Sequence, residues 1–184
     1  MGYSATETAQ KHERILDESI RLFREKGFHG VSVSEVMKAA GLTHGPFYNH
    51  FASKEALISE TLTRELQRVV ASFDEVPATE EGKSKYVEGY LSEGHVHNCS
   101  GGCAVAALSS EIRHEPGLRG TFTVQLKNVV QKMASYFPWK NRRSARGDAI
   151  HMQASMVGAL ILARAVDDPN FAREILEETR KRIG

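Results

Sequence analysis

"SVSEVMKAAGLTHGPFYNHFASKEAL", residues 32–57, joins short helical segments through glycine and proline, and this stretch decides the fold. Ser32 followed by Glu35 forms a capping box, in which each residue satisfies a backbone N–H of the other at the start of a helix. Gly41 ends this helix, because glycine adopts a positive φ angle without steric cost. Ser53 is expected to cap a further helix. The stretch therefore predicts helix, turn and second helix in close succession.

The second of these helices is short and rich in rings. Thr43 is expected to cap it at Gly45, because Pro46 falls at its third position and has no N–H to donate. Phe47 and Phe51 are four residues apart, so they lie on one face and are expected to point into the core with Leu42. This spacing predicts a helix-turn-helix with a very short recognition helix.

The opposite face of this helix carries small and polar side chains. Gly45 leaves the surface flat, so that a DNA backbone or base edge can come close. His44 and Asn49 can hydrogen bond to base edges or phosphates, whereas the other polar groups are suited to phosphate oxygens. The residues expected at a DNA interface are Ser32, Thr43, His44, Gly45, Tyr48, Asn49, His50 and Lys54. A helical hairpin whose rings are all core fits the spacing equally well.

Composition limits the classes of function. The chain has 184 residues, 41% of them hydrophobic, with a net charge of +1. No apolar run reaches the roughly 18 residues of a membrane span, and the N-terminus lacks the apolar region of a signal peptide. Two cysteines fit a reducing compartment, so a soluble cytoplasmic protein is expected. Residues 1–55 hold seven Lys or Arg and seven Asp or Glu, so charge does not itself favour DNA binding.

Helical periodicity continues through the rest of the chain, and strand patterns are scarce. Ser4 and Glu7 form a possible capping box for a first helix that stops at Gly27. The later helices are expected over residues 55–73, 82–95, 103–114, 118–137 and 144–166, with a last one entered at Asp168–Pro169. About nine helices and no sheet are expected, which is an all-α fold. "HVHNCSGG" is expected to break the chain after residue 95.

The helix over residues 144–166 is apolar around much of its circumference. One face contains Ile150, Ala154, Val157, Ile161 and Ala165, and further apolar residues lie beside it. Such a helix does not fit an ordinary surface position. Gly158 and Ala159 are small enough for another helix to approach closely. The helix is expected either to pair with a second copy of the chain or to lie buried in its own monomer.

"HVHNCSGGC", residues 95–103, contains four residue types that bind metals. Two well-separated ligand pairs, the usual pattern of a closed zinc site, are absent, so neither a metal nor a cofactor is expected. Cys99 and Cys103 could instead form a redox- or electrophile-sensing pair, and the simplest alternative is that both are structural. No catalytic-triad order, nucleophile elbow or phosphate loop is visible, so an enzyme is not expected.

Residues 23–57 resemble the N-terminal domain of the TetR family of transcriptional repressors. The resemblance rests on Lys26-Gly27-Phe28, Ala39-Ala40-Gly41, Gly45-Pro46-Phe47-Tyr48-Asn49-His50-Phe51 and Lys54-Glu55. It implies a helix-turn-helix domain over residues 1–55 and an effector-binding and dimerisation domain over 56–184. It further implies a homodimer formed through residues of about 144–182. The function implied is a repressor that binds a palindromic double-stranded operator and is released by a small-molecule effector.

The resemblance also implies an effector pocket among the C-terminal helices, connected to the DNA through the helix over residues 55–73. Pockets of this kind are mostly apolar, with a few polar anchors. The candidate lining residues are Tyr86, Tyr90, His95, Cys103, Phe122, Phe137, Trp139, Met152, Ser155 and Met156. A regulator that senses oxidants or electrophiles through Cys99 and Cys103 remains the alternative, and an enzyme the more distant one.

Overall fold

The computed structural model describes residues 5–184, and all regular structure in this range is helical. The α-helices are α1 (Ala5–Lys26), α2 (Val33–Ala39), α3 (Lys54–Ser72), α4 (Glu80–Tyr90), α5 (Glu93–His97), α6 (Ala104–Ile112), α7 (Pro116–Tyr136), α8 (Ala145–Ala165) and α9 (Pro169–Ile183). Two 3₁₀ helices, η1 (Gly45–Asn49) and η2 (Phe73–Glu75), complete the order. The all-α fold expected from the sequence is confirmed for these residues.

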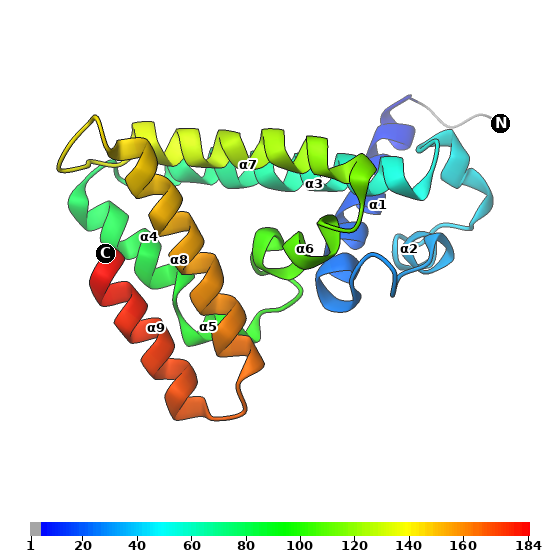
Figure 1. The fold of residues 1–184 in the computed structure, drawn as a ribbon. Coiled ribbons are helices and arrows are strands. Elements are labelled where there is room, and N and C mark those ends of the chain that lie inside the picture. The colour runs from blue at the N-terminus through cyan, green and yellow to red at the C-terminus, as the bar shows by residue number, and fades with distance from the viewer. Residues whose placement is uncertain (1–4) are drawn as a thin grey trace.

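The long helices α3 and α7 run side by side and in the same direction along the molecule (Figure 1). Ser59 and Thr121 share a hydrogen bond of 3.0 Å near the start of both helices. Near the other end, the Tyr136 hydroxyl donates to the Val76 carbonyl at 2.7 Å. The two helices therefore form a rod that connects the end carrying α1 and α2 with the end carrying α8 and α9.

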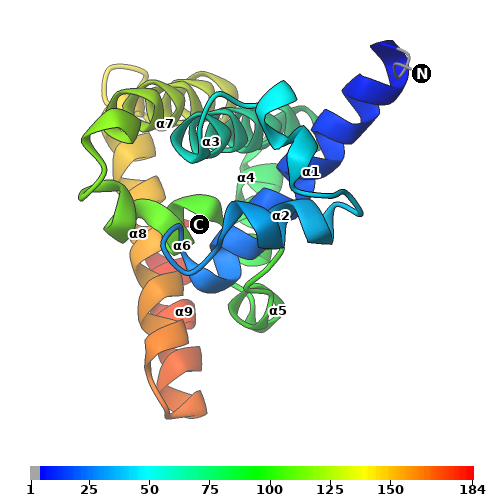
Figure 2. The ribbon, with the colours of Figure 1, turned by 90° about the vertical axis from the view of Figure 1, so that its right-hand side faces the viewer.

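Two groups of buried side chains form the core. The first lies among α1, α2, η1 and the start of α3, and it extends to Leu108 and Ile112 of α6. The second lies among the other helices and includes much of α8. α3 contributes Leu62 to the first group and Leu66 to the second. Viewed from the α1–α2 end, α6 lies to one side of α2, next to the C-terminal end of α1 (Figure 2). α3 and α6 thus contact both halves.

Several helix boundaries differ from those expected. A single helix over residues 82–95 is wrong, because α4 ends at Tyr90 and α5 starts anew at Glu93. Leu91 is buried at the junction, and the Ser92 hydroxyl caps α5 by accepting the His95 N–H at 3.2 Å. The possible cap at Ser4 lies outside the described residues. Among residues 5–184, no helix is both long and apolar enough to cross a membrane.

Candidate DNA-binding face and effector pocket

The capping box at the start of α2 forms as the sequence predicts. The Ser32 hydroxyl accepts the Glu35 N–H at 3.1 Å, and the Glu35 carboxylate accepts the Ser32 N–H at 2.8 Å. The Ser32 hydroxyl also donates to this carboxylate at 2.9 Å, so its proton is already engaged. Gly41 has a φ angle of +70° and turns the chain out of α2. These local interactions set the direction in which the next helix starts.

The recognition helix η1 is a 3₁₀ helix. The expected cap by Thr43 is wrong, because His44 holds the capping position and its side chain makes no capping bond. Pro46 lies at the second helical position rather than the third. The Phe47 N–H donates to the His44 carbonyl at 3.1 Å, a three-residue spacing that winds the backbone more tightly than an α-helix. The helix is therefore short, narrow and held largely by its buried rings.

The two faces of η1 divide as expected. Phe47 and Phe51 are buried, and the half-buried Leu42 packs against the same core. The outward face is exposed at Thr43, His44, Gly45, Tyr48 and Asn49. The Tyr48 side chain is 68% exposed. A Cβ added at Gly45 would meet no heavy atom within 4 Å, so the surface beside it is open.

His50 and Lys54 are less free than the sequence suggests. The His50 ring packs beside His12 and Phe51, with centroid distances of 5.7 and 6.2 Å. Burial, followed by the positive charges of His12 and Lys11, lowers the pKa of His50 and favours the neutral ring. The Lys54 ammonium donates to the Phe28 carbonyl at 2.5 Å and thus fastens the start of α3 to the end of α1.

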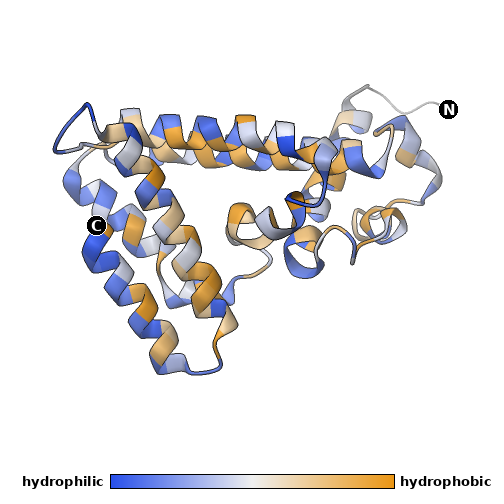
Figure 3. Ribbon diagram, in the orientation of Figure 1, coloured by the Kyte–Doolittle hydropathy of each residue, from blue (hydrophilic) through white to orange (hydrophobic). Residues whose placement is uncertain are grey.

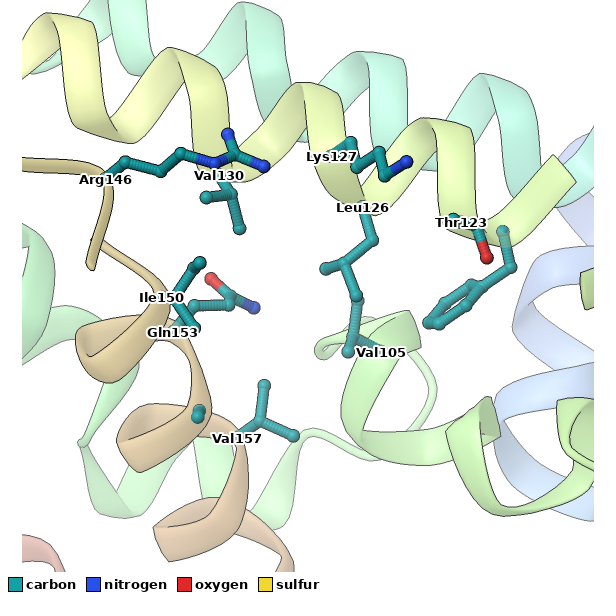
Figure 4. Close-up of a pocket in the computed structure, with 11 residues that line it drawn as sticks. Val105, Thr123, Leu126, Lys127, Val130, Arg146, Ile150, Gln153 and Val157 are labelled. Atoms are coloured by element: carbon teal, nitrogen blue, oxygen red, sulfur yellow. The ribbon is translucent and has the colours of Figure 1, made fainter. Parts of the chain in front are cut away.

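An open pocket of about 390 Å³ lies between α6, α7 and α8 (Figure 4). Its polar lining residues are Thr123, Lys127, Arg146 and Gln153. Its apolar lining residues are Val105, Phe122, Leu126, Val130, Ile150, Ala154 and Val157. Of the candidates taken from the sequence, only Phe122 lines this pocket. The sequence did not predict the other lining residues, because composition alone cannot show which arc of α8 faces α6 and α7.

The other aromatic and methionine candidates belong to the core beside the pocket. Tyr86 stacks on Phe73 at a centroid distance of 5.0 Å and also packs against Phe137. Met152 and Met156 are fully buried in the second core group, and Ser155 is half-buried. The Trp139 ring N–H donates to the Met133 carbonyl at 3.3 Å, at the far end of α7.

His95 joins the remaining two candidates around the α5–α6 connection. Its Nδ1 lies 2.7 Å from the Tyr90 carbonyl, and its Nε2 accepts the Cys103 N–H at 3.0 Å. The Tyr90 hydroxyl is buried without a hydrogen-bond partner, and burial raises its pKa. Cys103 precedes the first residue of α6 as expected, and both it and the exposed Cys99 are free thiols. The redox switch stays a prediction.

α8 presents two different apolar arcs. One arc, with Met152, Met156 and Ala159, is buried against its own monomer, so Ala159 is not available for contact with another chain. The opposite arc leaves Ile150, Ile161 and Leu162 between 43% and 55% exposed. The ribbon is strongly hydrophobic along the part of α8 nearest to α9 (Figure 3). One side of α8 is therefore buried in its own monomer, and the other side is exposed to a possible partner.

In sequence, the similarity to known proteins is centred on the helix-turn-helix. A sequence model of the bacterial regulatory proteins of the tetR family matches residues 15–61. The regulator UidR of Escherichia coli K12 is 37% identical over 75 residues, which are 41% of this chain and 38% of UidR. The repressor KstR2 of Rhodococcus jostii RHA1 is 28% identical over 113 residues, 60% of this chain and 55% of KstR2. Each match thus spans less than two thirds of the relative.

The similarity in structure extends further along the chain. A TetR-family transcriptional regulator from Agrobacterium tumefaciens superposes with a TM-score of 0.75. The superposition covers 95% of this chain and 98% of that protein, at 20% sequence identity, which is evidence for a shared fold. The helix-turn-helix is matched in sequence, and the α-helices around it are matched in arrangement. Residues 15–61 match the bacterial regulatory proteins of the tetR family, and the chain as a whole shares its fold with TetR-family regulators.

Proposed function

We propose that the protein is a transcriptional repressor that binds a palindromic operator as a dimer and is released by a small-molecule effector. The exposed outer face of η1 carries this proposal, because its polar groups surround an open surface at Gly45. The names of the relatives agree with it, since UidR is a transcriptional regulator and KstR2 a transcriptional repressor. A protein that acts on bacterial DNA works in the cytoplasm.

The DNA contacts follow from exposure and hydrogen-bonding capacity. His44 and Asn49 are exposed and read base edges in the major groove, where each base pair presents a distinct pattern. The Tyr48 hydroxyl contacts a phosphate, with Thr43 beside it. Ser32, His50 and Lys54 supply further phosphate contacts from the edge of the face. Because each of these three already has an intramolecular partner or ring contact, their share of the binding energy is smaller.

The two proposed domains follow each other along the chain. Residues 1–55 form the DNA-binding domain, and residues 56–184 form the effector-binding and dimerisation domain. The exposed arc of α8 is the centre of the dimer interface, which extends over residues of about 144–182. Six large apolar side chains among the described residues are substantially exposed, and three of these lie on α8 and α9 outside the pocket: Ile161, Leu162 and Phe171. Apolar patches of this kind mark interaction surfaces.

Effector binding reaches the DNA-binding domain through α6 as well as α3. Val105 of α6 lines the pocket, and Glu111 at the other end of α6 accepts the Phe28 N–H at 2.7 Å. Just beyond α6, the Glu115 carboxylate lies 2.9 Å from the His29 Nε2 atom. An effector that moves α6 therefore moves the end of α1. Thermodynamic linkage requires that DNA and effector weaken each other's binding by the same factor.

The test begins with selection of duplexes from a random pool by the purified protein. Tyr48→Phe should weaken binding to all selected duplexes to a similar extent, because a phosphate contact carries no sequence information. Asn49→Ala should change the preferred sequence at one position in each half-site, with a loss of roughly 1–3 kcal/mol for the original base. Asn128→Ala, an exposed change on α7, is the matched control. Fluorescence anisotropy measures each affinity.

Two results would contradict the proposal. One is a selection that recovers no enriched duplex. The other is a set in which Tyr48→Phe, Asn49→Ala and Asn128→Ala all bind like the parent protein at moderate salt. In either case the face of η1 does not enter a DNA groove.

A further inference from the structure

We infer that the effector is a small organic acid, with an apolar body of one ring or a short chain and a single carboxylate. This inference rests on the proposed function for the existence of an effector, and the pocket residues supply its chemistry. The pocket between α6, α7 and α8 has a volume of about 390 Å³, near the lower end of the roughly 300–1,000 Å³ found for small-molecule sites. Large ligands are therefore disfavoured.

The first observation is the Gln153 side chain. It extends from α8 into the pocket (Figure 4), and only 8% of the residue is exposed. Within residues 5–184 its amide makes no hydrogen bond, and neither amide atom is among the fully buried unpartnered polar atoms, so the amide faces the open pocket. A bound ligand that covers this amide must offer it a hydrogen bond, because a buried amide without a partner is costly. A purely apolar ligand would leave the amide unpaired.

The second observation is the charge around the pocket. Lys127 and Arg146 both line it, and none of its lining residues is acidic. In the described part of the chain neither cation has a carboxylate within 4.0 Å, and the one side-chain contact of Arg146 is the Gln131 amide oxygen at 3.3 Å. By contrast, Lys132 further along α7 pairs with Asp74. Two cations without acidic partners favour an anion and repel an amine.

The apolar wall defines the rest of the ligand. Leu126 of α7 and Val105 of α6 lie across the pocket from Ile150 and Val157 of α8 (Figure 4). Phe122 of α7 also lines the pocket. These side chains offer contact area and no hydrogen bonds. The matching molecule is amphipathic: the apolar body rests on this wall, and the carboxylate lies toward Gln153 and Arg146, on the opposite side of the pocket from the Lys127 ammonium (Figure 4). Charge-assisted hydrogen bonds then fix its orientation.

The test compares acids with alcohols and amines of the same carbon skeleton, without DNA present. Octanoate, 1-octanol and octylamine form one series, and 3-phenylpropanoate with 3-phenylpropanol forms another. Isothermal titration calorimetry should give acids that bind roughly tenfold more tightly than their alcohols, with the amine weakest. The double variant K127Q/R146Q should lose the preference for acids and retain alcohol binding. Gln153→Leu should also reduce the preference.

The control is K140Q/R142Q, which removes two exposed cations from the connection before α8 that do not line the pocket. It should keep the preference of the parent protein. Equal affinities of acids and alcohols in the parent protein would overturn the inference, as would the absence of acid binding at millimolar concentration. A change in sedimentation of K127Q/R146Q with unchanged ligand affinities would assign the groove to contact between copies, and that also overturns it.

DNA binding by the same proteins separates this inference from the proposed function. A protein that binds a selected duplex but none of the acids retains its proposed function and has another class of effector. A protein that binds the acids but recovers no duplex has the ligand site without the repressor function. If both hold, octanoate or 3-phenylpropanoate should weaken duplex binding in the parent protein and not in K127Q/R146Q.

Discussion

At the residue scale, Gly27 and Gly41 have nearly the same conformation in different surroundings. Their φ angles are +73° and +70°. A Cβ at Gly27 would meet the Glu111 carboxylate, whereas a Cβ at Gly41 would meet no heavy atom within 4 Å. We expect Gly41→Ala to cost about 1 kcal/mol of unfolding free energy from backbone strain alone. Gly27→Ala should cost about 1–2 kcal/mol more, because Glu111 must release the Phe28 N–H.

Urea denaturation of the two variants measures this difference. Equal losses of stability would show that Glu111 moves aside freely. The turn at each glycine could be predicted from the sequence, since both follow a helical run. The role of Glu111 could not, because this carboxylate is 83 residues from Phe28 along the chain. Lys54 is a similar case, as its bond to the Phe28 carbonyl depends on how α1 and α3 pack.

At the element scale, helices with strong local signals were predictable and those set by packing were not. The Ser32 box and the Ser53 cap both form, with the Ser53 hydroxyl accepting the Ala56 N–H at 3.0 Å. The 3₁₀ winding of η1 has no comparable signal, because it depends on the burial of Phe47 and Phe51. The pocket lies where three helices meet, so its lining depends on how those helices rotate about their axes. Of the residues predicted to line the pocket, only Phe122 does so.

The α5–α6 connection should lose stability in mild acid. His95 accepts the Cys103 N–H on Nε2, so a second proton there would oppose an existing donor. Burial is the largest cause that lowers the pKa of His95 below its ordinary value of 6.5. The unfolded chain therefore takes up the proton first as pH falls. Stability is full above about pH 7.5, declines through the unfolded pKa, and levels off below the lower folded pKa.

Urea midpoints between pH 8 and 5 measure this dependence. His95→Gln should flatten the decline, with a residual slope from His50, whose pKa is also lowered. The exposed His97, on the same short helix, provides the matched control His97→Gln, which should keep the slope of the parent protein. A parent protein equally stable at both ends of this pH range would contradict the assignment.

At the scale of the whole molecule, the rod of α3 and α7 separates the two functional ends. η1 lies at one end, and α8 with α9 lies toward the other (Figure 1). The sequence predicted an apolar α8 and left open whether a partner or its own monomer covers it. Both arcs of α8 are apolar, so hydrophobicity alone could not show which arc is buried and which is exposed. The packing against α7 and α9 uses one arc and leaves Ile161 and Leu162 exposed.

The exposed arc of α8 leads to the last prediction, which concerns assembly. Ile161→Arg introduces a charge at a side chain that is 43% exposed in the monomer, so the fold should tolerate it. In a dimer the same charge would be buried at the interface without a partner, at a cost of several kcal/mol. We expect the parent protein to sediment as a dimer at micromolar concentration and Ile161→Arg as a monomer with unchanged helical content.

Val124→Arg is the matched control, because Val124 is also exposed, at 55%, but lies on α7 outside this arc. It should remain a dimer. The monomeric Ile161→Arg should lose affinity for a palindromic duplex more than for a single half-site, since only a dimer contacts two half-sites together. A parent protein that sediments as a monomer would refute the dimer. If Val124→Arg dissociates and Ile161→Arg does not, the interface lies on α7, and the exposed arc of α8 has another partner.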